Sequence, residues 1–324
     1  MAMPPMYYYC AQRLDEVLIP KEPVAELRNR PDFADIITFY SLYPIVGTVM
    51  AESFASLSEC ELLDEKFFNS IPYFRKIKMP NQSTVVGKWI LRVMKPQPVY
   101  EAFASKQLED GRLRISVCDM ECIARISLGE LSGDMAIMSI TPNEIYTMEA
   151  PIAAATGNVL TFGLGLGYYA YSAHIKPEVT SVTIVEHDPD IIEIFNTYIL
   201  PQFDYPEKIK VIHADAYEFA SKTDSAHYSS VFVDIWYNCM DGINCYLEFL
   251  SMGWIGANIS YWLEDVLIDT LKQQLNSYPI TPYMRRLNTT SKPRRVILTS
   301  KSPMDIRKAV HSVIKHTASE RVPD

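Results

Sequence analysis

The chain has 324 residues, of which 48% are hydrophobic and 21% charged, with a net charge of −9 and a sequence pI near 5.3. This length allows one large or two ordinary domains with a sizeable core. The negative charge argues against a nucleic-acid partner bound through bulk charge, although a local basic patch stays compatible with it, and it suits a small-molecule substrate such as a cationic amine. No apolar stretch has the length of a bilayer span, and the first residues lack the pattern of a signal peptide, so we expect a cytoplasmic protein without a membrane partner.

Six cysteines are spread along the chain, at positions 10, 60, 118, 122, 239 and 245. Cys118 and Cys122 are four residues apart, Cys239 and Cys245 are six apart, and no histidine accompanies either pair. Neither spacing is that of a zinc knuckle. We therefore expect reduced thiols and no metal site.

The predicted secondary structure of the first 140 residues changes from helix to strand about halfway. Residues 11–80 are predicted to be mainly helical, because apolar residues recur at three- and four-residue intervals, as in Gly47–Phe68. After about residue 85 the pattern is typical of strands, with Glu109-Asp-Gly111 as a hairpin turn. The predicted strands are Val85–Met94, Val99–Ser105, Arg112–Cys118 and Ala136–Ile140. We expect a helical and then β-rich region over residues 1–140, and its helices are compatible with a homodimer.

A second region, residues 141–324, begins with a sequence that is typical of a helix N-terminus. In Thr141-Pro-Asn-Glu144 a threonine cap is followed by proline at the first helical position and by glutamate three residues on. From about residue 150 strands and helices alternate, which predicts a doubly wound, mostly parallel α/β sheet covered on both faces. The predicted strands are 159–162, 182–185, 209–212, 231–235 and 257–261, and the predicted helices are 168–174, 190–200, 216–222, 243–250 and 265–275. The pattern adds a strand over Arg294–Thr299 and a helix over Ile306–Lys315.

Three glycines at alternate positions follow the first of these strands. Gly163, Gly165 and Gly167 let the backbone turn sharply and approach a ligand closely. The helix that starts at Tyr168 offers free N–H groups and positive partial charge. In dinucleotide-binding turns the third glycine comes one residue later, where this chain has Tyr168. Without a pyrophosphate to hold, the turn suits a nucleoside with a side arm, and S-adenosylmethionine fits better than NAD.

Three acids stand at the ends of successive strands. Glu186 ends the second strand and suits the two ribose hydroxyls, each of which can donate one hydrogen bond to a carboxylate. Asp215, with Ala216 beside it, is placed to accept from an adenine amino group, to cap the next helix, or to do both. Asp234 ends the fourth strand and is the candidate for contact with the substrate or the methionine end of the ligand.

The residues near these acids and near the glycines in the sequence are interpreted as follows from their types and positions. Tyr168 is expected to contact the cofactor as part of an apolar pocket wall. Trp236 and Tyr237 are equally compatible with that wall and with the core or its rim. His213 is interpreted as structural, and Asp188 as the cap of a helix that begins at Pro189.

The ordered set of Gly163–Gly167, Glu186, Asp215 and Asp234 resembles the class I S-adenosylmethionine-dependent methyltransferase superfamily, and within it the spermidine synthase-like branch. The resemblance covers roughly residues 140–275. It implies that the glycines line the methionine and ribose, that Glu186 holds the ribose and Asp215 meets the adenine. It also implies that Asp234 helps to deprotonate an attacking amine. The small β-rich segment before the main domain is similar to that of aminopropyltransferases.

The chain departs from both groups at definite positions. Spermidine synthases have an aspartate inside the glycine turn, where this chain has Leu166, and a Ser/Thr-rich stretch after the fourth strand, where it has Ile235 to Asn238. Methyltransferases often have an acid where this chain has Thr161. The first hypothesis is therefore methyl transfer from S-adenosylmethionine to a small molecule, with Asp234 and Tyr237 as catalytic residues. The alternatives are aminopropyl transfer from decarboxylated S-adenosylmethionine, and a module that binds the nucleoside or a partner without catalysis.

Overall fold

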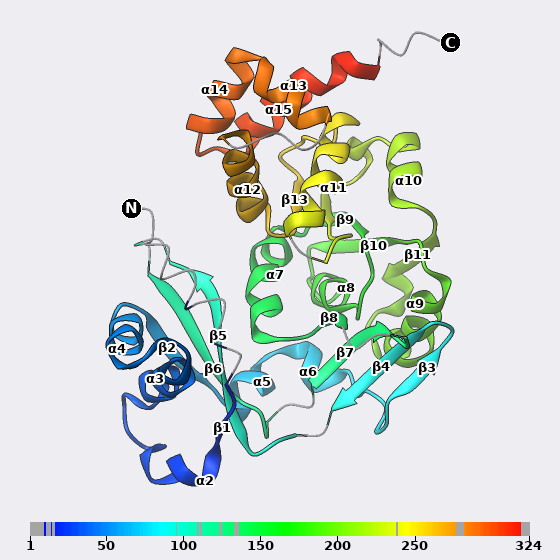
Figure 1. Cartoon of the computed structure of the whole chain (residues 1–324). Coiled ribbons are helices and arrows are strands. Elements are labelled where there is room, and N and C mark those ends of the chain that lie inside the picture. The colour runs from blue at the N-terminus through cyan, green and yellow to red at the C-terminus, as the bar shows by residue number, and fades with distance from the viewer. Residues whose placement is uncertain are drawn as a thin grey trace. The chain divides into compact units, whose positions relative to one another are not determined.

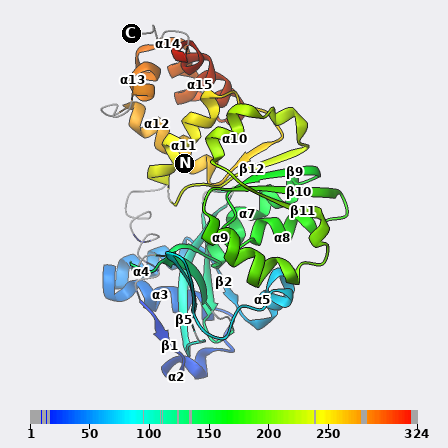
Figure 2. The same cartoon turned by 90° about the vertical axis from the view of Figure 1, so that its right-hand side faces the viewer.

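The computed structural model describes residues 10, 14, 17–94, 96–108, 110, 112–122, 125–132, 136–237, 239–276 and 282–318. The chain divides into two compact units, one formed by residues 1–149 with 196–203 and the other by residues 150–195 with 204–324. Figure 1 labels most elements of both units, and Figure 2 also labels β12. Among the described residues, no helix combines the length and the apolar character needed to cross a bilayer.

The first unit contains two four-stranded sheets. One has the order β1-β5-β6-β2 and the other β3-β4-β7-β8. Its strands are β1 Ile19–Pro20, β2 Glu59–Leu63, β3 Thr84–Val86, β4 Trp89–Met94, β5 Val99–Gln107, β6 Leu113–Asp119, β7 Arg125–Glu130 and β8 Ala136–Ser139. Its helices are α2 Lys21–Val24, α3 Phe33–Val46, α4 Thr48–Ser56, α5 Glu65–Ser70 and α6 Pro72–Lys76, with a 3₁₀ turn over Ala25–Leu27. Helix α7, Pro142–Ala154, leads into the second unit.

Three predictions for this unit were wrong or incomplete. Residues 59–63, expected to be helical, form strand β2, because they pair in parallel with β6 and tertiary pairing overrides local periodicity. The single strand predicted over 85–94 is a hairpin, with Gly87 in the left-handed region (φ +53°) between β3 and β4. Strand β7 was not predicted at all. Of the predicted turn at 109–111, only residue 110 lies within the described residues, and the strands on either side of it, β5 and β6, pair antiparallel.

The second unit contains one parallel sheet of five strands in the order β11-β10-β9-β12-β13. The strands are β9 Gly157–Phe162, β10 Val179–Glu186, β11 Ile209–His213, β12 Ser230–Val233 and β13 Ile259–Tyr261. The helices are α8 Tyr168–His174, α9 Pro189–Ile194, α10 Ala216–Lys222, α11 Cys239–Ser251, α12 Glu264–Asn276, α13 Pro282–Thr289, α14 Ser291–Thr299 and α15 Pro303–Ala318. Short turns are π-helical over Phe195–Ile199 and 3₁₀ over Leu200–Gln202, Pro206–Lys208 and Ser225–His227.

Helices cover both faces of this sheet, as the alternating pattern predicts. Figure 2 shows α8 and α9 on one face of β9, β10 and β11, and α10 and α11 on the other. On the first face Tyr169 of α8 stacks on Phe232 of β12, with ring centroids 4.3 Å apart. On the second face Phe162 packs against Phe249 of α11 and against Trp254. The prediction of a mixed α/β fold with a parallel sheet is therefore confirmed.

The end of the chain differs from its prediction. Residues 294–299, expected to be a strand, belong to helix α14, whose Ile297 is fully buried against the sheet's core cluster. The predicted helix over 306–315 is confirmed as part of α15. The short apolar run Val296-Ile-Leu298 is compatible with either state, and helical packing decides it.

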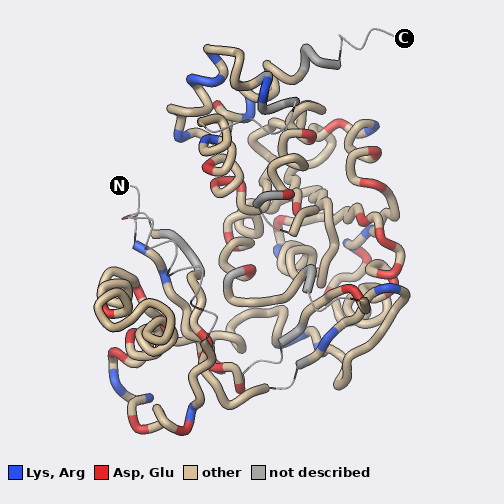
Figure 3. The backbone as a smooth tube through the Cα atoms, in the orientation of Figure 1, with Lys and Arg blue, Asp and Glu red and all other residues tan. Residues whose placement is uncertain are grey.

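Charge is unevenly spread along the chain. In Figure 3 the Lys and Arg positions gather on α13, α14 and α15, whereas Asp and Glu predominate along the segment from α9 to α11. The chain as a whole has 39 Asp and Glu against 30 Lys and Arg.

Candidate functional site

The glycine turn and Asp234 meet at the carboxyl ends of two neighbouring strands. β9 pairs with β10 on one side and β12 on the other, so the strand order reverses between β9 and β12. In open α/β sheets ligands bind outside the carboxyl ends of the strands at such a reversal. The Asp234 N–H donates to the Phe162 carbonyl at 3.0 Å, which holds the two strand ends together. The carboxyl edge at β9 and β12 is therefore the candidate site.

Gly163 is required by this junction. Its φ is +93°, and a Cβ added there would lie 1.9 Å from the Asp234 carbonyl oxygen. Backbone packing thus explains this glycine without any ligand. Gly167 has a left-handed conformation (φ +71°) at the start of α8. The contact of Gly163, Gly165 and Gly167 with a ligand stays a prediction.

The Glu186 carboxylate faces the glycine turn. Only 6% of its side chain is exposed, and one oxygen accepts the Leu164 N–H at 3.1 Å. The other oxygen accepts the N–H groups of His187 and Asp188, each at 2.9 Å. The sequence placed Glu186 at the end of β10, and the fold brings it back to the turn that follows β9.

Asp215 and Asp188 are both helix caps. Asp215 is exposed and accepts the Glu218 N–H at 2.8 Å, at the start of α10 where Ala216 is the first residue. Asp188 is buried and accepts the Asp190 N–H at 3.0 Å, with Pro189 at the first position of α9. Capping is thus one role of Asp215, and the contact of Asp215 and Ala216 with an adenine stays a prediction.

Asp234 is the acid with the most unusual environment. Its side chain is partly buried, and within the described part of the chain no hydrogen bond to its carboxylate is recorded. Burial raises its pKa from 3.8 to about 7, because the ionised form loses hydration without a compensating donor. A carboxyl group with a pKa near neutrality can both take up and release a proton at physiological pH.

The aromatic residues near the edge divide into core and surface. Trp236 is 5% exposed and belongs to the core, where Gly242 leaves room for it: a Cβ there would lie 2.7 Å from the indole. Tyr237 is 59% exposed, and its N–H donates to the Asp241 carboxylate at 3.0 Å. Tyr168 is buried at the first turn of α8. Tyr237 is thus the accessible aromatic group, and its catalytic role stays a prediction.

Sequence reasoning missed a buried ion pair beside this edge. Arg307 of α15 donates to both Glu264 carboxylate oxygens, at 2.6 and 2.5 Å, and to the Gly256 carbonyl at 2.8 Å. Tyr246 donates to the same carboxylate at 2.8 Å, and the guanidinium lies over the Tyr261 ring. The two partners are 43 residues apart and no local pattern links them.

A left-handed residue just before this ion pair was also missed. Leu263, between β13 and α12, has φ +54°, and it is the one non-glycine residue with positive φ in the described ranges. Leucine adopts this conformation rarely, and nothing in the sequence signals it.

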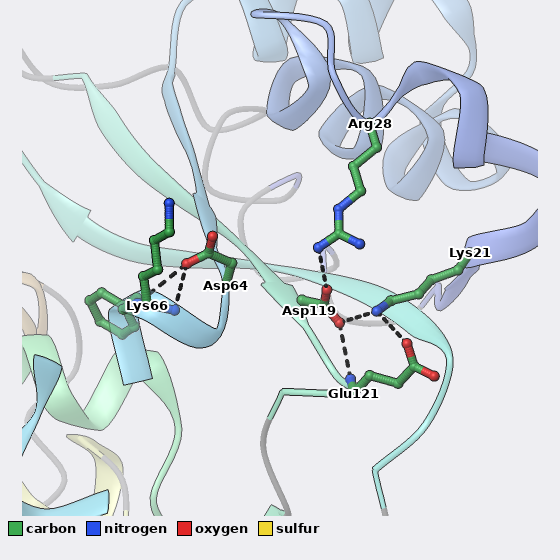
Figure 4. Close-up of polar contacts among 7 residues, drawn as sticks. Lys21, Arg28, Asp64, Lys66, Asp119 and Glu121 are labelled. Carbon is green, nitrogen blue, oxygen red and sulfur yellow. Dashed lines mark hydrogen bonds and ion pairs between the residues drawn. The ribbon is translucent and has the colours of Figure 1, made fainter. Parts of the chain in front are cut away.

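A second charged cluster, in the first unit, is structural. Figure 4 shows the buried Asp119, at the end of β6, held by Lys21 and by Arg28, whose Nη2 lies 3.3 Å from the carboxylate. Lys21 also pairs with Glu121 at 2.7 Å. Within the described residues, no three His, Cys, Asp or Glu side chains form a group that could hold a metal ion.

His174, at the end of α8, gives a prediction for stability. Its ring is fully buried, Nδ1 contacts the Tyr171 carbonyl at 2.5 Å, and Nε2 accepts the Asp204 N–H at 3.2 Å. The ring is therefore neutral, and burial lowers its pKa below 6.5. Since the folded pKa lies below the unfolded one, this contribution to stability is present above about pH 6.5 and is lost as the pH falls further.

We expect His174→Gln to reduce the loss of unfolding free energy between about pH 7.5 and 5.5, measured by urea titration. The control, His227→Gln, makes the same substitution at an exposed histidine. An unchanged slope in His174→Gln would contradict the assignment.

No protein-family model and no curated protein sequence matches the chain. Among solved structures, the spermidine synthase of Thermotoga maritima matches 55% of this chain and 53% of its own, with 15% identity and a TM-score of 0.30. The SAH-bound methyltransferase PaMTH1 of Podospora anserina matches 58% of this chain and 74% of its own, with 15% identity and a TM-score of 0.31. The match therefore spans about half the length of the spermidine synthase.

Proposed function

We propose that the carboxyl edge at β9 and β12 binds S-adenosylmethionine, and that the protein is an S-adenosylmethionine-dependent transferase that methylates a small molecule. The observation that carries the proposal is the position of Glu186: its carboxylate is turned to the glycine turn, at the reversal of strand order. An acid beside a backbone turn suits a ribose whose two hydroxyls both donate hydrogen bonds.

The residues at this edge fit the nucleoside. Glu186 Oε2 accepts the Leu164 N–H and keeps acceptor capacity for a hydroxyl group, because a carboxylate oxygen can accept two hydrogen bonds. Oε1 already accepts the His187 and Asp188 N–H groups and lies 3.0 Å from His187 Nδ1. Asp215 would meet the adenine while it caps α10. When bound, S-adenosylmethionine supplies an already activated methyl group, so the protein has mainly to orient the acceptor.

Asp234 is the proposed proton acceptor. Its raised pKa, about 7, means that a large fraction of the carboxyl is ionised at neutral pH and that the ionised form is a stronger base than an exposed aspartate. The Asp234 carboxylate would take a proton from an acceptor hydroxyl or ammonium and then return it to water. The exposed Tyr237 would contribute an aromatic face to the acceptor side.

Aminopropyl transfer is the second candidate, and the same Asp234 favours it. An amine nucleophile is protonated at neutral pH, so a carboxylate with a pKa near 7 is matched to removing its proton. Leu166 argues against aminopropyl transfer. This leucine is fully buried at the position where the resemblance would place a carboxylate that contacts the ligand. Incubation of putrescine with each donor separates the two reactions, since methyl transfer releases S-adenosylhomocysteine and aminopropyl transfer releases methylthioadenosine.

We expect Glu186→Ala to weaken S-adenosylmethionine binding about 10- to 100-fold, because hydrogen bonds to a charged acceptor contribute roughly 1.5–3 kcal/mol. Isothermal titration with S-adenosylmethionine, its decarboxylated form and NAD measures this. The matched control is Asp64→Ala, which removes a carboxylate that also accepts two backbone N–H groups, those of Lys66 and Phe67 (Figure 4).

Equal affinity of Glu186→Ala and the wild type for every adenosyl-sulfonium compound would overturn the proposal. Binding without turnover over a broad acceptor panel would instead support the non-catalytic module. A stronger affinity for NAD than for S-adenosylmethionine would indicate a dinucleotide-binding protein instead of an S-adenosylmethionine-dependent transferase.

A further inference from the structure

The last three helices have a charge opposite to that of the rest of the chain. Between Pro282 and Ala318, nine residues are Lys or Arg and one, Asp305, is acidic, whereas the whole chain has a net charge of −9. These residues form α13, α14 and α15, coloured orange to red in Figure 1, and their cations gather together in Figure 3. A reversal of charge within one chain indicates a localised electrostatic function.

Two of the nine cations have a structural role. Arg307 is buried on Glu264, and Arg294 donates to the Asn288 side chain at 2.8 Å and to the Leu275 carbonyl at 3.4 Å. Five others are exposed, and within the described residues none of these five makes an ion pair. They are Arg285, Lys292, Arg295, Lys301 and Lys308. The name "basic helical surface" is used below for these five side chains.

The fold itself does not need the basic helical surface. The three helices are held by fully buried apolar side chains, among them Leu287, Ile297, Ile306 and Val310. Five like charges on one small helical unit repel one another and destabilise it by a small amount. A partner with closely spaced negative charges would offset that repulsion.

We propose that the basic helical surface binds the phosphodiester backbone of a nucleic acid. Arginine and lysine side chains neutralise successive phosphates, and the arginine fork matches phosphate geometry in two hydrogen bonds. An anionic lipid surface is the competing partner, and it requires apolar side chains that enter the interface. Among the residues of α13–α15 whose side-chain burial the structure describes, no large apolar side chain is exposed, which favours the nucleic acid.

This inference is independent of the transferase proposed above. The remaining surface carries the excess of acidic residues and repels a polyanion, so binding is confined to α13–α15. Because the contacts are ionic and made to the backbone, we expect little dependence on nucleotide sequence and a strong dependence on salt.

The test is fluorescence anisotropy of the full chain with a labelled duplex of about 20 base pairs and with a single strand of similar length, from about 50 to 200 mM salt. The variant is Lys292→Ser with Arg295→Ser and Lys301→Ser. The matched control removes three exposed cations elsewhere, with Lys66→Ser, Arg75→Ser and Lys210→Ser. Circular dichroism melting checks that both triple variants are folded, and vesicles of anionic and neutral phospholipid form a separate arm.

We expect the wild type and the control to bind nucleic acid with an affinity that falls steeply with salt. The variant that lacks Lys292, Arg295 and Lys301 should bind about tenfold more weakly or worse, with a salt slope shallower by about two to three units. Either equal binding by the two triple variants, or no binding by the wild type at the lowest salt, would overturn the proposal. Binding to anionic vesicles without binding to nucleic acid would also overturn it.

Discussion

Replacement of Arg307 by alanine is expected to lower the free energy of unfolding by about 3–5 kcal/mol. Arg307 is 4% exposed, and its guanidinium makes three hydrogen bonds, to both Glu264 oxygens and to the Gly256 carbonyl. Its loss leaves the Glu264 carboxylate in a poorly hydrated site with only the Tyr246 hydroxyl as a recorded donor among the described residues. Urea titration followed by circular dichroism measures the effect.

Two further variants make this test specific. Lys308→Ala, at the next position, removes an exposed cation and should change stability by less than about 0.5 kcal/mol. Arg307→Met combined with Glu264→Leu removes both charges and should recover much of the loss, because a well-packed apolar pair often replaces a buried ion pair at little cost. A loss of less than about 1 kcal/mol in Arg307→Ala would show that the pair is not buried in solution.

Asp234→Asn should abolish most of the proposed activity while it stabilises the protein at high pH. Loss of a positioned general base lowers the rate of transfer by about 10²- to 10⁴-fold. The stability effect follows from the raised pKa, about 7 in the folded chain against 3.8 when unfolded. Between these values the unfolded chain binds fewer protons than the folded one, so wild-type stability falls as the pH rises.

The asparagine variant lacks this titration. Its advantage over the wild type should be small near pH 4 and grow to at most about 4 kcal/mol above pH 7, measured by urea titration over that range. The control, Asp269→Asn, makes the same change at an exposed side chain of α12. Activity equal to that of the wild type would remove Asp234 from the mechanism, and a pH-independent difference in stability would contradict its raised pKa.

The sequence predicts the parallel sheet well because β9, β10 and β12 are apolar and mostly buried, and because β9 is followed by a glycine turn and β10 and β11 by capping acids. Asp188 and Asp215 are such caps, and they fix the starts of α9 and α10. Strand β2 could not be predicted, because its residues pair with a segment 55 positions away. The prediction for the α14 segment was wrong for a related reason. Its short apolar run has no clear preference for helix or strand, and packing against the neighbouring helices decides its conformation.

For the candidate site, position was predictable but orientation was not. The ends of β9, β10 and β12 follow from apolar runs, so Glu186 and Asp234 could be placed at one edge of the sheet. The inward turn of the Glu186 carboxylate and the partial burial of Asp234 depend on how the loops fold back. The ion pair between Arg307 and Glu264 and the positive φ of Leu263 depend on long-range packing, and no local sequence pattern indicates them.

The contact between Gly163 and the Asp234 carbonyl limits how this protein can be redesigned. A mutant library aimed at a new acceptor cannot vary position 163, since even one methyl group would push the two strand ends apart and displace the proposed base. Exposed Tyr237, only three residues beyond that aspartate, tolerates replacement sterically. Diversity introduced there would test the proposed acceptor role of Tyr237 while the junction stays intact.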